Sequence, residues 1–286
     1  DVTDPATPKA LWEFKYSSTC YDGTAATAGA GCHLGYSYGN PIIGKLTDGT
    51  WVVFATSGYN NVNTPTAVAG DGQGYLYVLN AVTGKIIYKI GTGAGDAFTP
   101  SGLSRIAGWV DNAIRNNTIL RIYGGDLLGN IWRFDVNDIL GIGGREASKV
   151  AQVIDSAGNP QPITTRPVLS ENQAGEPVIY VATGRYLGLT DLSNTQTQSV
   201  WSIRDPMSST VTGLRSTLAH LTMTNVGSGT TAYRTISCSA QCTSTEGWFV
   251  DLPDSGERVN VDMQLVLGSL VGPSNVPTTN AWDIGG

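Results

Sequence analysis

The chain has 286 residues, of which 41% are hydrophobic and only 14% charged, and its formal net charge is −6. This composition excludes a disordered tail and favours a sizeable buried core. The acidic balance, without a basic stripe, argues against nucleic acid and anionic membranes as partners. No apolar run approaches the roughly 20 residues that a membrane-spanning helix needs.

The length is enough for one large β domain or two ordinary domains. The 36 glycines, 12 tyrosines and 7 tryptophans are typical of many short strands joined by turns. The first residues, DVTDPATPKALWEF, predict the end of one strand, a turn and the start of another. With no signal peptide ahead of them, we expect the chain to be a fragment of a longer precursor.

Four units that resemble propeller blades follow in chain order. They lie near residues 42–90, 119–138, 163–206 and 246–276. Large apolar side chains alternate with smaller or polar ones in these units, which predicts strands. One aromatic residue anchors each unit: Tyr77, Trp132, Trp201 and Trp248. This recurrence predicts an all-β fold, a β-propeller of antiparallel blades.

We expect residues 1–286 to form a single β-propeller domain or a portion of one. About four units are visible, and each blade must bury one face against the next, so the propeller is expected to be incomplete. The segment VNDILGIGGREASKVAQVI (136–154) has some helical character. Gly141, Gly143 and Gly144 interrupt it, which predicts a loop or one short helical turn.

The four cysteines form two local pairs. Cys20 and Cys32 bracket a small-residue loop, and Cys238 and Cys242 bracket SAQ. These spacings differ from the paired C-x2-C knuckles of zinc modules. They favour two local disulfides and an oxidising compartment, with a four-cysteine zinc site or free thiols as the alternatives.

The stretch GDLLGN (125–130) predicts a tight structural turn. Asp126 and Asn130 can bond backbone amides across the turn, and Gly129 is free to take a positive φ. A catalytic role for these residues is the alternative, and we favour the turn.

Isolated polar residues elsewhere predict structure rather than chemistry. His33 and His220 are the only histidines, and we expect both to be structural. Ser57 and Ser101 lack the G-x-S-x-G elbow and are predicted to be turn serines. Asp71 lies in a glycine-rich stretch with no helix after it, which predicts a flexible hairpin insertion rather than a phosphate loop.

Blocks such as IYGGDLLGNIWRFDV, YVATGRYLG and GWFVDLPDSGERVNVDMQLVLGSLVGPSNVP cover nearly the whole chain. Together they resemble the PilY/PilC family of type IV pilus biogenesis and tip-associated proteins. The blocks come in the family order, and GDLLGNIWRFD and ATGRYLG are the more specific ones. Trp282 stands where family members often have a cysteine.

The resemblance implies a C-terminal β-propeller behind a von Willebrand A-like region. It implies a non-enzymatic module that supports pilus biogenesis, twitching and adhesion, with no firmly expected cofactor. The expected location is extracellular, at the pilus tip or outer membrane of a Gram-negative bacterium. Expected partners are pilins or minor pilins, host or surface ligands, and the remaining propeller and N-terminal regions of the parent chain.

Two other functions use a similar fold. A quinoprotein dehydrogenase would need a cofactor over a central channel, a bound calcium, a catalytic acid and adjacent cysteines, and this chain has no Cys-Cys pair. A carbohydrate-binding propeller could stack sugars on Tyr59, Trp109 or Tyr186.

In the family that this chain resembles, a calcium loop often precedes the Y-x-G-D-L-x-G-N block. Here Asp111 is the one carboxylate, Arg115 adds a positive charge, and Leu120 stands where the closing acid is expected. Neutral oxygens come only from Asn112, Asn116 and Asn117. Calcium prefers six to eight oxygens, several from carboxylates, so we predict an ordinary hairpin with lost or weak calcium binding. A second calcium site near Asp191 remains open.

Overall fold

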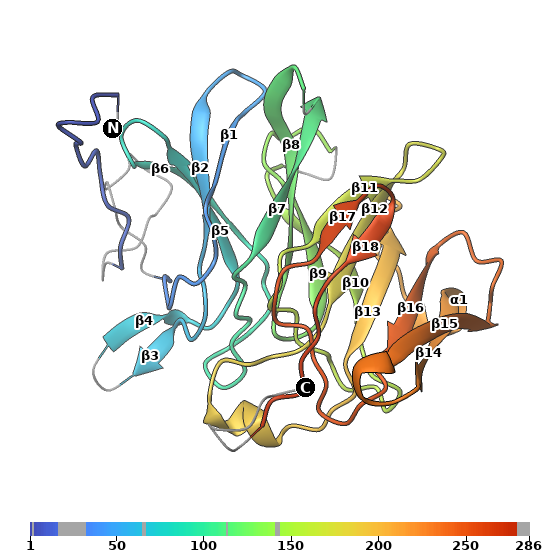
Figure 1. The fold of residues 1–286 in the computed structure, drawn as a ribbon. Coiled ribbons are helices and arrows are strands. Elements are labelled where there is room, and N and C mark those ends of the chain that lie inside the picture. Colours follow the sequence, from blue (N-terminus) through green and yellow to red (C-terminus); the bar gives the residue numbers. More distant parts are fainter. Residues whose placement is uncertain (2, 17–32, 65–66, 113, 141–143, 279–286) are drawn as a thin grey trace. The chain divides into compact units, whose positions relative to one another are not determined.

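The computed structural model describes the chain except for residues 2, 17–32, 65–66, 113, 141–143 and 279–286 (Figure 1). The described residues form strands β1 to β18, with helical structure only in α1 (Leu214–Thr217), η1 (Leu189–Ser193) and η2 (Gly229–Thr231). The all-β prediction is therefore confirmed. None of these helical segments is long and apolar enough to cross a bilayer.

The chain divides into two compact units. Unit 1 comprises Asp1–Gly124 and Trp132–Ser148, and unit 2 comprises Gly125–Ile131 and Lys149–Gly286. The division passes through strands β9 and β10, because each of them begins in one unit and ends in the other.

The larger sheet has eight strands in the order β10-β9-β8-β1-β2-β5-β6, with β7 paired to β8. Its strands are β1 (Ile42–Lys45), β2 (Trp51–Thr56), β5 (Tyr75–Asn80), β6 (Ile86–Gly91), β7 (Ile106–Asn112), β8 (Asn116–Gly125), β9 (Asn130–Asp135) and β10 (Ala147–Gln152). Strand β2 pairs antiparallel with β1 and with β5, while β1 and β8 meet in parallel.

Alternation along β2 and β5 places apolar side chains on both faces of the sheet in unit 1. Val52 and Phe54 belong to one core cluster, and Val53 belongs to another on the opposite face. Trp12 and Phe14 pack on the second cluster, and the Trp12 Nε1 donates a hydrogen bond of 2.9 Å to the Ala81 carbonyl.

The N-terminal prediction is wrong, because residues 3–14 contain no strand. Within the segment, backbone hydrogen bonds join Lys9 to Asp1 and Thr7 to Asp4. The partly buried side chains of Trp12 and Phe14 attach it to the sheet.

Unit 2 contains a six-stranded sheet in the order β11-β12-β13-β16-β14-β15. Its strands are β11 (Val168–Glu171), β12 (Pro177–Ala182), β13 (Ser199–Arg204), β14 (Ala219–Val226), β15 (Tyr233–Ala240) and β16 (Gly247–Asp251). Strand β16 lies between β13 and β14, antiparallel to the first and parallel to the second. Trp201 of β13 and Phe249 of β16 stack at 4.8 Å in its core.

Two short hairpins complete the fold. One joins β3 (Val62–Thr64) to β4 (Ala67–Asp71), and the other joins β17 (Gln264–Val266) to β18 (Ser269–Val271).

The prediction of a loop or helical turn for residues 136–154 is wrong in part, because Ala147–Gln152 is strand β10. Val150 and Ala151 are fully buried there, and β10 pairs with β9. This pairing depends on a neighbouring strand, so the local sequence period does not reveal it.

Candidate functional site

In the GDLLGN turn between β8 and β9, Asp126 bonds backbone amides as predicted, while the Asn130 side chain bonds the Asp126 carboxylate instead of a backbone amide. The Asp126 Oδ1 accepts from the backbone N–H groups of Leu128 and Asn130 at 3.0 and 2.9 Å, and its Oδ2 accepts from the Asn130 Nδ2 at 3.0 Å. Gly129 has φ +74°, and a Cβ there would lie 2.5 Å from the Val153 carbonyl oxygen. The turn is fully buried at Asp126, so its carboxylate serves the backbone.

Two further turns in unit 2 repeat this chemistry. Asp155 accepts from the N–H groups of Ala157 and Asn159, both at 2.9 Å, and Asn172 accepts in the same way from Ala174 and Glu176. The glycine before the last residue has a positive φ in each. The spacing D/N-x-x-G-N/E is the sequence signal for these turns, and a turn was predicted from it only at GDLLGN.

A polar network in unit 2 surrounds Asp251. The Arg215 guanidinium donates to both carboxylate oxygens of Asp251, at 3.0 and 2.7 Å, and the Ser199 hydroxyl donates at 2.6 Å. Burial would raise the pKa of Asp251, but the hydrogen bonds from Arg215 and Ser199 outweigh it and hold that pKa below its usual value. The carboxylate is therefore ionised, and both of its oxygens accept hydrogen bonds.

The carbonyl oxygens of the loop around Asp191 accept hydrogen bonds from a buried arginine, Arg258. The Arg258 guanidinium, 4% exposed, donates to four backbone carbonyls: those of Gly256, Arg185, Asp191 and Asn194. The Asp191 carboxylate accepts from the Arg185 Nε at 2.7 Å and from the N–H groups of Leu187 and Gly188. These oxygens are the type of ligand that calcium would need, and Arg258 and Arg185 already use them, so the residues around Asp191 do not fit a calcium site.

The candidate calcium segment forms the β7–β8 hairpin. The Asn112 Oδ1 accepts from the N–H groups of Ile114 and Arg115, both at 3.1 Å. The Asn116 Oδ1 accepts from the N–H and hydroxyl of Thr118, at 3.1 and 2.7 Å. Both amide oxygens thus serve the hairpin. The Asp111 side chain lies outside the described part of the structure.

No group of three or more histidine, cysteine, aspartate or glutamate side chains is placed to hold a metal among the residues that the structure describes. Calcium binding at Asp111, Asn112 and Asn116 therefore stays a question for solution measurement.

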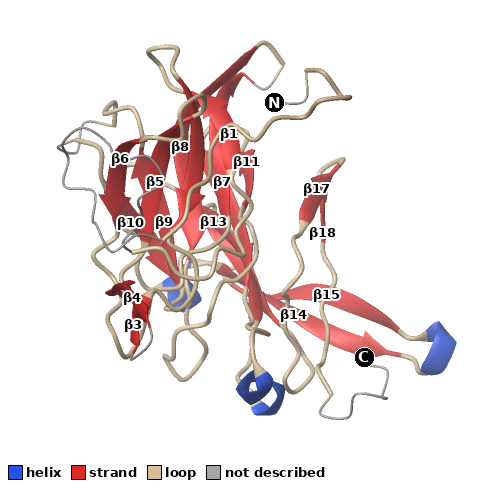
Figure 2. Ribbon diagram, turned by 90° about the vertical axis from the view of Figure 1, so that its left-hand side faces the viewer, coloured by secondary structure: helices blue, strands red, loops and turns tan. Residues whose placement is uncertain are grey.

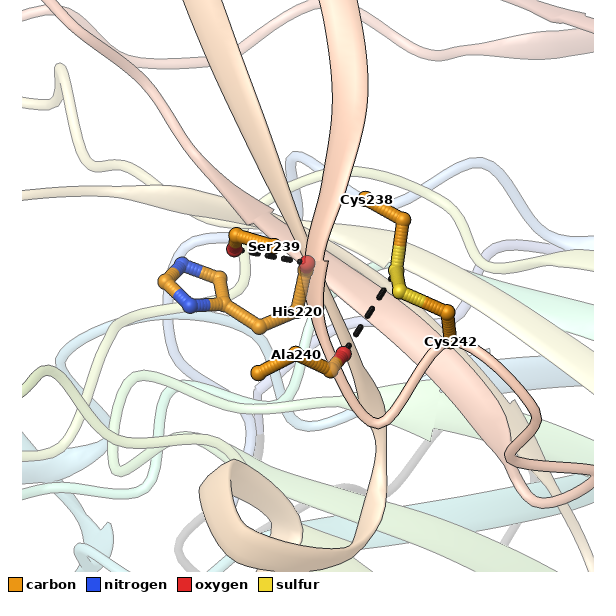
Figure 3. The surroundings of a disulfide bond; sticks show 5 residues. All are labelled: His220, Cys238, Ser239, Ala240 and Cys242. Carbon is orange, nitrogen blue, oxygen red and sulfur yellow. Dashed lines mark hydrogen bonds between the residues drawn. A yellow bond between two sulfur atoms is a disulfide. The ribbon is translucent and has the colours of Figure 1, made fainter.

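One predicted disulfide is present. Cys238 and Cys242 are bonded, with their Cα atoms 5.8 Å apart, at the end of β15 (Figure 3). Beside the bond, the Ser239 hydroxyl donates to the His220 carbonyl at 3.0 Å. Cys20 and Cys32 lie outside the described residues, as does Trp282.

Both histidines are packed against aromatic rings. His220 stacks on Phe249 with ring centroids 4.6 Å apart. The His33 Nδ1 lies 3.2 Å from the Asp71 carboxylate, which also accepts from the Tyr75 hydroxyl at 2.7 Å. Burial lowers the pKa of His33. Asp71, predicted to lie in a hairpin insertion, ends strand β4 of the β3–β4 hairpin and contacts His33 there.

The three aromatic residues considered for sugar stacking differ in exposure. Tyr59 is buried, and Trp109 is covered by the Arg121 guanidinium, 4.3 Å from its ring. Tyr186 is 44% exposed.

These features define a class of protein: an all-β domain whose interior acids hold turns and sheets together. Residues 1–232 match the family described as the PilY1 beta-propeller domain, and the chain belongs to that family. The resemblance stated from the sequence is thereby confirmed.

Two curated relatives and one solved structure show the extent of the likeness. A type IV pilus biogenesis factor PilY1 homolog of Xylella fastidiosa is 31% identical over 97% of this chain and 20% of its own length. Type IV pilus biogenesis factor PilY1 of Pseudomonas aeruginosa is 27% identical over 100% of this chain and 27% of its own length. The chain therefore spans about a fifth to a quarter of these relatives.

The crystal structure of the Pseudomonas aeruginosa PilY1 C-terminal domain superposes with a TM-score of 0.72 at 24% identity, over 97% of this chain and 61% of that chain. With the family match, this likeness confirms the predicted β-propeller fold.

Proposed function

We propose that the chain is a non-enzymatic propeller module of a type IV pilus biogenesis factor, which supports pilus assembly, twitching and adhesion at the cell surface. The single observation that carries this proposal is the family match over residues 1–232, with relatives named as type IV pilus biogenesis factors. Pilins or minor pilins and surface ligands are its proposed partners.

The interior chemistry supports a scaffold role. The acids that a hydrolase or dehydrogenase would use as bases are instead engaged with backbone amides and arginines, at Asp126, Asp155, Asp191 and Asp251. The proposal includes lost or weak calcium binding at the β7–β8 turn, and residues 1–286 as a portion of a larger propeller.

The experiment is an in-frame deletion of this region in the parent protein of its own organism, with the intact gene restored as a control. We expect fewer surface pili, reduced twitching and reduced attachment, with unchanged growth. An immunoblot of surface fractions establishes that the shortened parent is still exported. Normal piliation and attachment by an exported deletion product would contradict the proposal.

The dehydrogenase alternative has its own test. Reconstitution of the purified chain with a quinone cofactor and calcium should give no substrate oxidation, and turnover above the cofactor alone would replace the scaffold proposal with an enzyme.

A further inference from the structure

The edge strands of the two large sheets differ in how well they are protected against pairing with another strand. Edge strand β6 carries Lys89, and edge strand β10 carries Lys149. Edge strand β11 is only four residues long and ends in Glu171. Lysines, other charges and short length are the devices by which natural sheets prevent another strand from pairing with an open edge.

Edge strand β15 is neither short nor protected by a lysine, and its one charge is Arg234. It is eight residues long, YRTISCSA, with no lysine or proline, and seven of its residues are exposed. Tyr233 and Ile236 are 59% and 56% exposed. Figure 2 shows β14 and β15 running out together as a long hairpin, and in the sheet β15 has β14 as its neighbour on one side only.

The one charge on β15 is already neutralised. The Arg234 guanidinium donates to Asp254 at 2.8 Å and to Glu257 at 2.5 Å, and its Nε donates to Asn225 at 2.9 Å. Arg234, Asp254 and Glu257 together carry a charge of −1 when all three are ionised, so this end of the edge is mildly acidic.

The hairpin is also braced at its other end. The Cys238–Cys242 disulfide and the hydrogen bond from Ser239 to His220 fix β15 where it leaves the sheet (Figure 3). An edge that is already extended and fixed loses little conformational entropy when another strand pairs with it.

We infer that β15 binds an extended segment of a partner protein by β-strand addition. An eight-residue edge offers about four N–H and four C=O groups to an added strand. The central part of the segment is uncharged and rich in β-branched residues, which suits an exposed and largely neutral edge. The segment carries a basic residue beside the acidic Arg234 end. A second copy of this chain fits less well, because each copy has a net charge of −6.

The test measures fluorescence anisotropy with labelled synthetic peptides on the purified chain. The first probe has a core of alternating threonine and valine with a lysine at each end. The second has glutamate at each end, and the third is the lysine probe with a central proline. We expect micromolar binding of the lysine probe, at least fivefold weaker binding of the glutamate probe, and no binding of the proline probe.

Two variants locate the binding. Ile236→Lys places a lysine guard on the edge and should weaken binding at least tenfold. Thr222→Lys makes the same charge change at an exposed position of β14 that is paired on both sides, with Ser237 of β15 and Asp251 of β16, and should change binding less than twofold. Ser237→Lys provides a second edge variant, and the unfolding temperature of each establishes that it is folded. Hydrogen exchange should slow in 233–240 when the lysine probe binds.

Three outcomes would overturn the inference. They are no binding of the lysine probe to the wild-type chain, equal binding to Ile236→Lys, and concentration-dependent dimerisation of the wild-type chain that Ile236→Lys abolishes. The last would assign the edge to a second copy. These results are independent of piliation, so the edge can fail while the pilus proposal stands.

Discussion

The two ends of strand β8 use the same turn chemistry in different surroundings. At its start, Asn112 caps the β7–β8 hairpin in solvent, where Ile114 is 93% exposed. At its end, Asp126 caps a buried turn whose Gly129 carbonyl accepts from the Val153 N–H at 2.8 Å. The capping hydrogen bonds are local at both ends of β8. Only at its end does a neighbouring segment, around Val153, cover the turn and bury it. We therefore expect the end of β8 to tolerate much less change than its start.

The largest effect is expected from Gly129→Ala. The new Cβ would lie 2.5 Å from a backbone oxygen, at a φ of +74°. We expect a loss of about 3 kcal/mol in the free energy of unfolding, measured by chemical denaturation. Gly158→Ala is the matched control, since its φ is +88° but a Cβ there meets nothing within 4 Å, and it should cost about 1 kcal/mol. Equal losses would show that the covering segment is irrelevant.

Next in size is the removal of the caps. Asp126→Ala leaves the buried N–H of Asn130, the half-buried N–H of Leu128 and the Asn130 amide without their acceptor, so we expect a loss of about 2–3 kcal/mol. Asn112→Ala exposes its donors to water and should cost about 0.5 kcal/mol. Comparable denaturation midpoints for the two variants would remove the distinction between the ends of β8.

A smaller effect is expected from the pH dependence of the Asp155 turn. Burial would raise the pKa of Asp155, but hydrogen bonds from Gln196, Asn159 and Ala157 outweigh it and lower that pKa. A lowered pKa in the folded state stabilises the protein above the unfolded pKa of about 4, and this contribution is lost as the pH falls through the folded pKa. Wild type should exceed Asp155→Asn in stability at pH 7, and the gap should close below pH 4. A gap that is constant from pH 7 to pH 3 would show that ionisation plays no part.

The smallest effect is expected from calcium at the start of β8. Calorimetric titration of calcium into the chelator-treated chain should give no micromolar binding, and Asp111→Ala should behave like wild type. Micromolar binding that disappears in Asp111→Ala would show that this end of β8 is a metal site.

Local patterns predicted strands within the four units and the GDLLGN turn, because period-two alternation and turn residues act over a few positions. Strands β7 and β15 lie outside those units. Strand β10 was missed because its pairing with β9 decides its conformation. The Asp251 network was missed for the same reason, since Arg215 and Ser199 reach it from 36 and 52 residues away in sequence. The Cys238–Cys242 disulfide was within reach of the sequence because it spans only four positions.

The pilus assignment is tested most directly by the yield of pili sheared from cells whose parent protein lacks residues 1–286 but is still exported. The account predicts a clear loss of sheared pilin relative to wild type, restored by the intact gene, with the pilin pool inside the cell unchanged. A wild-type yield of sheared pilin from the deletion strain would contradict it.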